Sequence, residues 1–203
     1  GAAATIEDSV ANVRANDVTA VRQQLRQAVA VHGPGGFVTG VATPLLHAIG
    51  DAWEAGTISI QQEHVASELI STQLRVLTSA YEVLDVRPRV LLTTLPDEQH
   101  KLGSELVALY VALRGASPRS LGASTPVDEI LSAADELDAD IVAIGTSPAY
   151  DEGDARAHMA KLARGLPKER ELWVGGAEIR VKRATAITSW QDIDDALVAW
   201  RAR

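Results

Sequence analysis

The chain contains no cysteine. This absence excludes disulfides, thiolate metal sites, iron–sulfur clusters and cysteine nucleophiles together. Any bound metal must therefore use histidine and carboxylate side chains, or arrive inside a ligand. With 203 residues, 46% of them hydrophobic, the chain is long enough for one large or two small domains whose cores need no covalent crosslink.

Long apolar segments and an excess of basic residues are also lacking. No run approaches the roughly 20 apolar residues that span a bilayer. The start, Gly1-Ala2-Ala3-Ala4, lacks the basic residues and apolar core of a signal peptide. A formal charge of −8 and a pI near 5.1 would repel phosphate backbones. We therefore expect a cytoplasmic protein that contacts no membrane and that, by itself, binds no nucleic acid.

The first part of the chain, from residue 5 to about residue 84, has the period of amphipathic helices. A short helix is predicted before Asn16, and a second after Asp17, which is placed to be its N-cap. Apolar residues of the second helix recur at three- and four-residue steps: Val18, Val21, Leu25 and Val29. The run Gly33-Pro34-Gly35-Gly36 is predicted to end this helix.

Two further helices would complete a four-helix bundle over residues 5–86. On one face of the third helix lie, at i, i+4 and i+8, Leu45, Ile49 and Trp53. Gly56 is predicted to end that helix. Ser59 opens the fourth, with Gln62 placed for a capping box, and the fourth helix is predicted to run to about Leu84. Loops this short make neighbouring helices antiparallel.

Beyond Arg87-Pro88, short apolar runs alternate with helical segments. The predicted strands cover residues 90–95, 120–123, 141–144, 171–174 and 184–187. The predicted helices cover residues 104–114, 126–137, 155–164 and 192–201, the second introduced by Thr125 and the last capped near Ser189. Such alternation implies right-handed crossovers and a parallel sheet with helices on both faces. The expected fold class is α + α/β: a four-helix bundle followed by a Rossmann-like, flavodoxin-like domain over residues 89–203.

Polar residues and glycines gather where these strands end, which is the edge at which ligands bind in such sheets. In strand order they are His100, Ser124, Gly145-Thr146-Ser147 and Gly175-Gly176. A histidine that ligates a metal needs one bare ring nitrogen, and a carboxylate that accepts the proton of the other nitrogen enforces that tautomer. Glu98 is placed to do this for His100. Gly103 carries no side chain, so a bulky group could lie close to the backbone there.

Residues 89 to about 187 resemble the cobalamin-binding domain of the methionine synthase and methyltransferase corrinoid proteins. That family has the pattern Asp-x-His-x-x-Gly, then a Ser or Thr turn, then Gly-Gly; the residues here are Glu98-x-His100-x-x-Gly103, Ser124 and Gly175-Gly176. The resemblance implies that His100 is the axial ligand of cobalt and that Glu98, one methylene longer than the family's Asp, orients it. It also implies a slot for the nucleotide tail. The cofactor-binding residues expected around that slot are Gly103, Ser124, Gly145, Thr146, Ser147, Gly175 and Gly176.

A second constellation lies upstream, where Trp53 precedes Glu63-His64 by a nine-residue spacer. A turn over residues 54–58 would bring Trp53 near the other two. An indole, a carboxylate and an imidazole offer a nucleoside an aromatic face, an acceptor for ribose hydroxyls and a further polar anchor. Separately, a tryptophan in an apolar stripe is typical of a bundle core, and a Glu-His pair of a solvated first turn.

The Trp-x9-Glu-His signature resembles the CarH/LitR class of adenosylcobalamin-dependent photoreceptors, repressors with a MerR-type DNA-binding domain. The resemblance covers residues 5 to about 187. It implies that the bundle caps the upper face of the corrin, with Trp53 over the 5′-deoxyadenosyl group and with Glu63 and His64 in contact with it. In that family light breaks the Co–C bond, the bundle shifts, and oligomers assembled in the dark dissociate. Here Glu54 stands where well-studied members have a histidine that can ligate cobalt after photolysis.

The function implied is a non-enzymatic, light-responsive sensory module that binds adenosylcobalamin, assembles as a homo-oligomer in the dark and regulates transcription. DNA would be reached only through another domain or a partner protein. Two alternatives share the lower ligand: a corrinoid methyl carrier of a methyltransferase system, and a cobalamin sensor without photochemistry. An α/β domain that binds no cofactor is the remaining alternative.

Overall fold

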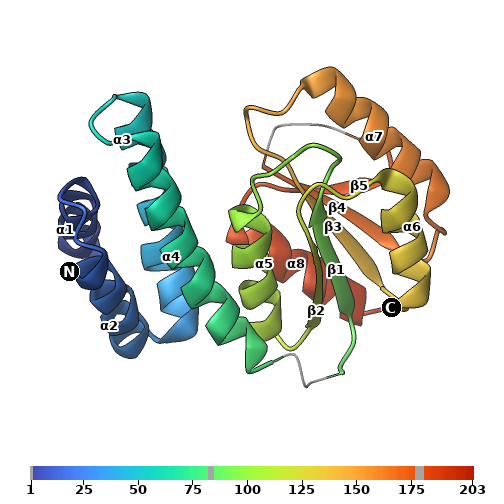
Figure 1. The fold of residues 1–203 in the computed structure, drawn as a ribbon. Helices are drawn as coiled ribbons and strands as arrows, with labels where there is room; N and C mark the ends of the chain where they lie inside the picture. Colours follow the sequence, from blue (N-terminus) through green and yellow to red (C-terminus); the bar gives the residue numbers. More distant parts are fainter. Residues whose placement is uncertain (1, 82–84, 177–180) are drawn as a thin grey trace. The chain divides into compact units, whose positions relative to one another are not determined.

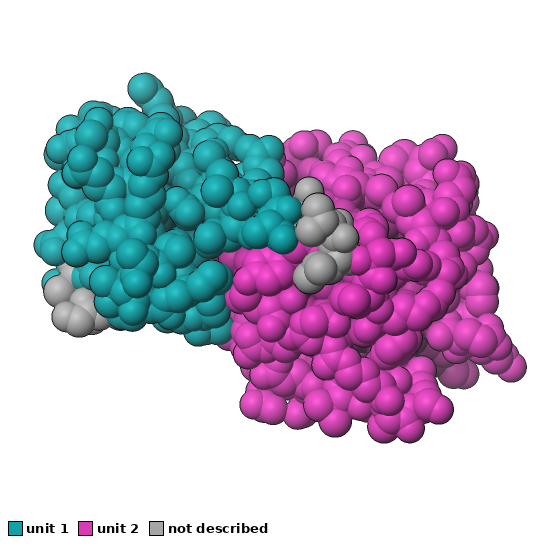
Figure 2. All heavy atoms as spheres, turned by 90° about the horizontal axis from the view of Figure 1, so that it is seen from below, with its two compact units in different colours: residues 1–80 teal, residues 81–203 magenta. Residues whose placement is uncertain are grey.

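A computed structural model describes residues 2–81, 85–176 and 181–203. The chain divides into two compact units, Gly1–Ala80 and Tyr81–Arg203, which Figure 2 colours separately. None of the described helices is both long enough and apolar enough to cross a membrane.

The first unit is helical, as the sequence predicts (Figure 1). Its elements are α1 (Ala2–Arg14), α2 (Val18–Phe37), the π-helical turn η1 (Val38–Ala42), α3 (Thr43–Glu54) and α4 (Ile60–Ser79). The predicted caps are confirmed. Asp17 Oδ1 accepts a hydrogen bond from the N–H of Ala20 at 2.9 Å. Ser59 and Gln62 form the capping box, at 3.2 Å and 2.8 Å.

The break at Gly33-Pro34 differs from the prediction. Gly33 has φ +67° and interrupts the helical path, a backbone conformation that glycine adopts without strain. Pro34 then restarts the helix at once, since proline lacks an N–H and suits a first helical turn. The helix continues through η1 into α3, so Gly33 alone, and not the whole predicted run Gly33-Pro34-Gly35-Gly36, interrupts the helical path. The fourth helix ends at Ser79, and the predicted end at Leu84 lies outside the described residues.

The second unit is an α/β fold with five parallel strands. The strands are β1 (Arg89–Thr94), β2 (Ser117–Gly122), β3 (Ile141–Gly145), β4 (Glu171–Gly175) and β5 (Ala184–Ile187). Their order is β2-β1-β3-β4-β5, the flavodoxin-like arrangement. The helices are α5 (Leu102–Leu113), α6 (Val127–Glu136), α7 (Glu152–Gly165) and α8 (Trp190–Arg201). In Figure 1, α5 and α8 cover one face of the sheet and α6 and α7 the other.

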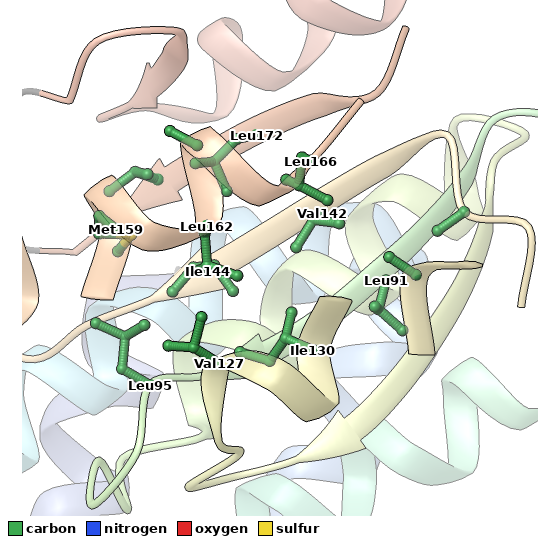
Figure 3. Packing of buried hydrophobic residues seen from close by; sticks show 14 of the residues in the cluster. Leu91, Leu95, Val127, Ile130, Val142, Ile144, Met159, Leu162, Leu166 and Leu172 are labelled. Atoms are coloured by element: carbon green, nitrogen blue, oxygen red, sulfur yellow. The ribbon is translucent and has the colours of Figure 1, made fainter. Parts of the chain in front are cut away.

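A buried apolar cluster joins the sheet to α6 and α7. Alternate strand residues point to this face, and Figure 3 shows Leu91, Val142 and Leu172 of the strands facing Ile130 of α6 and Leu162 of α7. All five are 2% exposed or less. The cluster anchors β1, β3 and β4, so the loops that follow these strands leave a rigid base.

Two details of this unit correct the sequence prediction. β2 begins at Ser117, three residues earlier than expected, and includes Pro118. Because β2 is an edge strand, it tolerates a residue without an N–H. Thr125 does not cap α6: its hydroxyl lies 2.6 Å from that of Thr93, and the N-cap position is Pro126, which makes no side-chain cap.

Candidate functional site

The strand order reverses between β1 and β3, and in open parallel sheets ligands bind at such a switch point, beyond the carboxyl ends of the strands. The loop after β1 leads to α5 on one face, and the loop after β3 leads to α7 on the other. Glu98 and His100 lie in the first loop and Ser147 in the second. The strands therefore bring together residues that are 49 positions apart.

Glu98 is the centre of this arrangement. Its Oε1 accepts from the backbone N–H of His100 at 2.9 Å and from His100 Nδ1 at 2.6 Å. Its Oε2 accepts from the backbone N–H and the hydroxyl of Ser147 at 2.8 Å and 2.7 Å. The residue is only 2% exposed. Burial raises the pKa of Glu98, but the hydrogen bonds from His100 and Ser147 outweigh it and lower the pKa below its ordinary value. The carboxylate is therefore ionised at neutral pH.

The imidazole of His100 is held on one side and open on the other. Its side chain is 69% exposed. Because ionised Glu98 can only accept, Nδ1 carries the proton of this bond, and in the neutral ring Nε2 is then the unprotonated acceptor. Among the described residues, no hydrogen bond occupies Nε2. The structure thus offers one exposed imidazole nitrogen in the tautomer that a metal requires.

Hydrogen bonds with Thr94 and Ser124 hold the main chain of the loop that follows β1. Thr94 Oγ1 donates to the carbonyl of Glu98 at 2.6 Å and accepts from the N–H of Ser124 at 2.8 Å. Ser124 Oγ in turn accepts from the N–H of Asp97 at 2.9 Å. Sequence reasoning missed Thr94. The available signal was a hydroxyl residue in the last position of a buried apolar strand, where the carboxyl edge begins.

The glycines of the predicted slot have different surroundings. A Cβ on Gly176, which has φ +96°, would lie 1.7 Å from the carbonyl oxygen of Thr146, so no side chain fits. A Cβ on Gly145 would lie 2.8 Å from Ser104 Oγ. A Cβ on Gly103 would meet nothing within 4 Å. Gly103 therefore leaves accessible space at the start of α5, whereas the other two glycines allow strands and loops to pack closely.

Thr146 and Gly175 link the carboxyl ends of the neighbouring parallel strands β3 and β4. Thr146 is 6% exposed, and its Oγ1 donates to the carbonyl of Gly175 at 3.2 Å. The backbone N–H of Thr146 donates to the same carbonyl at 3.0 Å. These bonds connect the ends of two neighbouring strands at the carboxyl edge of the sheet.

Trp53, Glu63 and His64 all lie at the end of the helical unit where α3 passes into α4. Trp53 is in the last turn of α3 and is 47% exposed, which excludes the bundle core as its place within this unit. Glu63 Oε2 bonds to His64 Nδ1 at 2.5 Å, and Glu63 Oε1 accepts from the hydroxyl of Ser67 at 2.7 Å. His64 is 69% exposed. Within the described structure, no hydrogen bond or ring contact joins Trp53 to either residue.

A family model described as the B12 binding domain matches residues 5–78. Residues 5–78 thus match a B12-binding domain. The HTH-type transcriptional repressor CarH of Myxococcus xanthus is 30% identical over 178 residues, which are 88% of this chain and 59% of CarH. The chain spans about three fifths of the length of that relative. An uncharacterized 20.5 kDa protein from the bchF-crtJ intergenic region of Rhodobacter capsulatus is 30% identical over 144 residues, covering 68% of this chain and 73% of that protein.

Among solved structures, the monomethylamine corrinoid protein of Methanosarcina barkeri has the same fold. The TM-score is 0.75 at 17% identity, and the similarity covers 100% of both chains. The predicted fold class, a helical part followed by a Rossmann-like parallel sheet, is confirmed.

The residues at the carboxyl edge fit a corrinoid. A corrin ring supplies its own four nitrogens to cobalt, so the protein would need to provide only an axial ligand, and the exposed imidazole of His100 is a chemically suitable one. No group of three or more histidine and carboxylate side chains in the described part of the chain could hold a metal ion. The accessible space at Gly103 lies three residues beyond the imidazole, where a large ligand could cover the backbone.

Proposed function

We propose that this chain is an adenosylcobalamin-binding sensory module that responds to light and regulates transcription. Its output would be a change in domain packing or in the oligomeric state. The observation that carries the proposal is the combination, in one chain, of the Glu98–His100 pair with exposed Trp53, exposed His64 and half-buried Glu63. Similarity to a transcriptional repressor over 88% of the chain supports regulation as the output.

The sheet unit would supply the lower face of the site. His100 would coordinate cobalt through Nε2, while Glu98 keeps the proton on Nδ1 and Ser147 keeps the carboxylate in place. Gly103 and Ser124, with Gly145-Thr146 at the end of β3 and Gly175-Gly176 at the end of β4, would surround the nucleotide tail. Since Glu98 is buried and ionised, it also favours the positive charge that the imidazole shares with a bound metal.

The helical unit would supply the upper face. Trp53 offers an indole surface to an adenine, Glu63 offers acceptors to ribose hydroxyls, and His64 is a further polar anchor. Adenosylcobalamin, when bound, supplies the absorption of light and a cobalt–carbon bond that light breaks. The residues of the chain would bind and orient the cofactor and would convert the loss of its upper group into a change of the protein. Trp53, Glu63 and His64 stabilise one arrangement of the protein only while they have an upper group to contact, which makes the module a population switch.

The test is reconstitution of the purified chain with adenosylcobalamin in darkness, followed by absorption spectroscopy and size-exclusion chromatography before and after green light. We expect a spectrum that changes on illumination and a shift of the elution volume. A protein that takes up no corrinoid would refute the proposal. Binding with an unchanged spectrum and elution volume would assign the chain to sensors without photochemistry.

The variant Trp53→Ala tests the upper face, with Trp200→Ala in α8 of the sheet unit as a matched loss of an indole. We expect Trp53→Ala to reduce the preference for adenosylcobalamin over methylcobalamin and to leave binding of the corrin largely intact. Trp200→Ala should leave the preference unchanged. Equal effects of the two substitutions would argue against contact between Trp53 and the adenosyl group.

A corrinoid methyl carrier is the second candidate, because the geometry of Glu98, His100 and Ser147 would serve it equally well. Competition between the two cofactor forms separates the candidates. Preference for methylcobalamin would favour the carrier, and preference for adenosylcobalamin would favour the sensory module.

A further inference from the structure

Tyr150 joins the loop that carries His100 to the loop after β3 and to α7. Its hydroxyl donates to the carbonyl of Pro96 at 2.7 Å and lies 3.2 Å from Nδ1 of His158 in α7. A carbonyl oxygen can only accept, so the hydroxyl proton is directed to Pro96. The contact with His158 then requires Nδ1 of that ring to be the donor.

The tyrosine bonds to the carbonyl side of the Pro96–Asp97 peptide group, whose N–H side donates to Ser124 Oγ. Thr94 and Ser147 fix the carbonyl and the carboxylate of Glu98. Pro96 has no N–H, and among the described residues the recorded partner of its carbonyl is Tyr150. The bond therefore acts where the chain leaves β1, two residues before Glu98 and four before His100.

Tyr150 remains a donor at neutral pH. Its side chain is partly buried, and burial is the main cause that raises the pKa of Tyr150. The nearby carboxylates of Asp154, Asp97, Glu98 and Asp151 act in the same direction.

We propose that Tyr150 is a positioning residue for His100, acting through the Pro96 carbonyl on the loop that presents the imidazole. The inference rests on the proposed function, in which His100 binds cobalt. A ligand group on a loop must be ordered when it coordinates, and a hydrogen bond that orders the loop beforehand lowers that cost. Removing the bond gives the uncoordinated loop more freedom and so favours the detached imidazole.

The experiment compares Tyr150→Phe with Tyr110→Phe. Tyr110 is a matched control, because its hydroxyl is also hydrogen-bonded, to Asp194 at 3.0 Å and to Arg114 at 2.7 Å, between α5 and α8. In the protein without cofactor, hydrogen exchange of the amides of residues 97–100 should become about threefold to tenfold faster in Tyr150→Phe only, the range expected for one hydrogen bond.

With cobalamin bound, the fraction of protein with histidine coordinated is measured by absorption as the pH is lowered. Tyr150→Phe should lose coordination at a pH about 0.5 to 1 unit higher than the wild type, which is the same threefold to tenfold change. Tyr110→Phe should follow the wild type.

The two arms separate the two hypotheses. Unchanged exchange at residues 97–100 in Tyr150→Phe overturns the positioning role without reference to the cofactor. An unchanged coordination curve overturns it as well, although the proposed function then stands. A wild-type protein that binds cobalamin without histidine coordination overturns the role of His100, and the role of Tyr150 with it.

Discussion

Replacing Glu98 by glutamine tests the geometry of the site directly. The amide has nearly the size of the carboxylate, but one oxygen becomes an NH₂ donor. In either orientation that donor faces two other donors, those of His100 or those of Ser147. Against His100, Nδ1 must become the acceptor, and the proton moves to Nε2, the atom needed for metal. Against Ser147, a backbone N–H loses its acceptor.

The cost follows from the bonds that are lost. A hydrogen bond to a charged group contributes about 1.5–3 kcal/mol, and a buried donor left without a partner costs about 1–3 kcal/mol. We expect Glu98→Gln to lower the free energy of unfolding by about 2–4 kcal/mol and the Tm by on the order of 10 °C. Glu129→Gln, at an exposed position in the first turn of α6, is the control and should change stability by no more than about 0.5 kcal/mol.

The stability lost in Glu98→Gln should depend on pH. The pKa of Glu98 is lower in the folded protein than in the unfolded chain, where a glutamate titrates near about 4.3. Its stabilising effect is therefore complete above that value and is lost as pH falls through the lower, folded pKa. Asp85 and Asp192 also have lowered pKa values, but they are common to both proteins and cancel in the difference.

The assay is urea unfolding of wild type and Glu98→Gln at neutral pH and at several pH values between about 5 and 3. We expect the gap in unfolding free energy to be full at neutral pH and to narrow as the medium becomes acidic. If Glu98→Gln lowers the unfolding free energy at neutral pH no more than Glu129→Gln does, the claim that Glu98 is a buried carboxylate with four hydrogen bonds is refuted. A gap that is independent of pH would refute its lowered pKa.

Three further substitutions test separate parts of the structure. His100→Ala should abolish the histidine-coordinated cobalamin spectrum and lower the free energy of unfolding by about 1.5–3 kcal/mol, because buried Glu98 loses its bond from Nδ1 but keeps its bonds from Ser147 and from the backbone. Gly176→Ala should cost about 3 kcal/mol or more in urea unfolding, since its Cβ would overlap the carbonyl of Thr146. Ser59→Ala should destabilise the helical unit by about 1 kcal/mol, because the capping box is lost. The measurement is thermal unfolding followed by the helical circular dichroism signal. A stable Gly176→Ala protein would contradict the close approach of the two loops.

Features set by neighbouring residues could be predicted from the sequence. The caps at Asp17 and Ser59 depend on partners three positions away, and the bond between Glu98 and His100 spans two positions. The strand periods gave the fold class. The start of β2 was missed because Pro118 argues against a strand, and only the strand order reveals that β2 is an edge.

Contacts between distant loops could not be predicted, because they depend on register. Thr94 pairs with Gly145 across β1 and β3, and this register places Ser147 within reach of Glu98. The same register brings Tyr150 to Pro96. Sequence reasoning could locate Ser147 after a strand, but it could not tell which loop it would face. The roles of Thr94 and Tyr150 therefore became apparent only in three dimensions.

The bond between Glu98 and Ser147 joins the loops that follow β1 and β3, the two strands between which the strand order reverses. One end belongs to the segment that enters α5, and the other to the segment that leads to α7, on the opposite face. A force on the His100 ring would consequently act on the helices of both faces, and not on one loop alone. This connection would restrict the movement of the ring and would transmit any small displacement of it to the whole α/β unit.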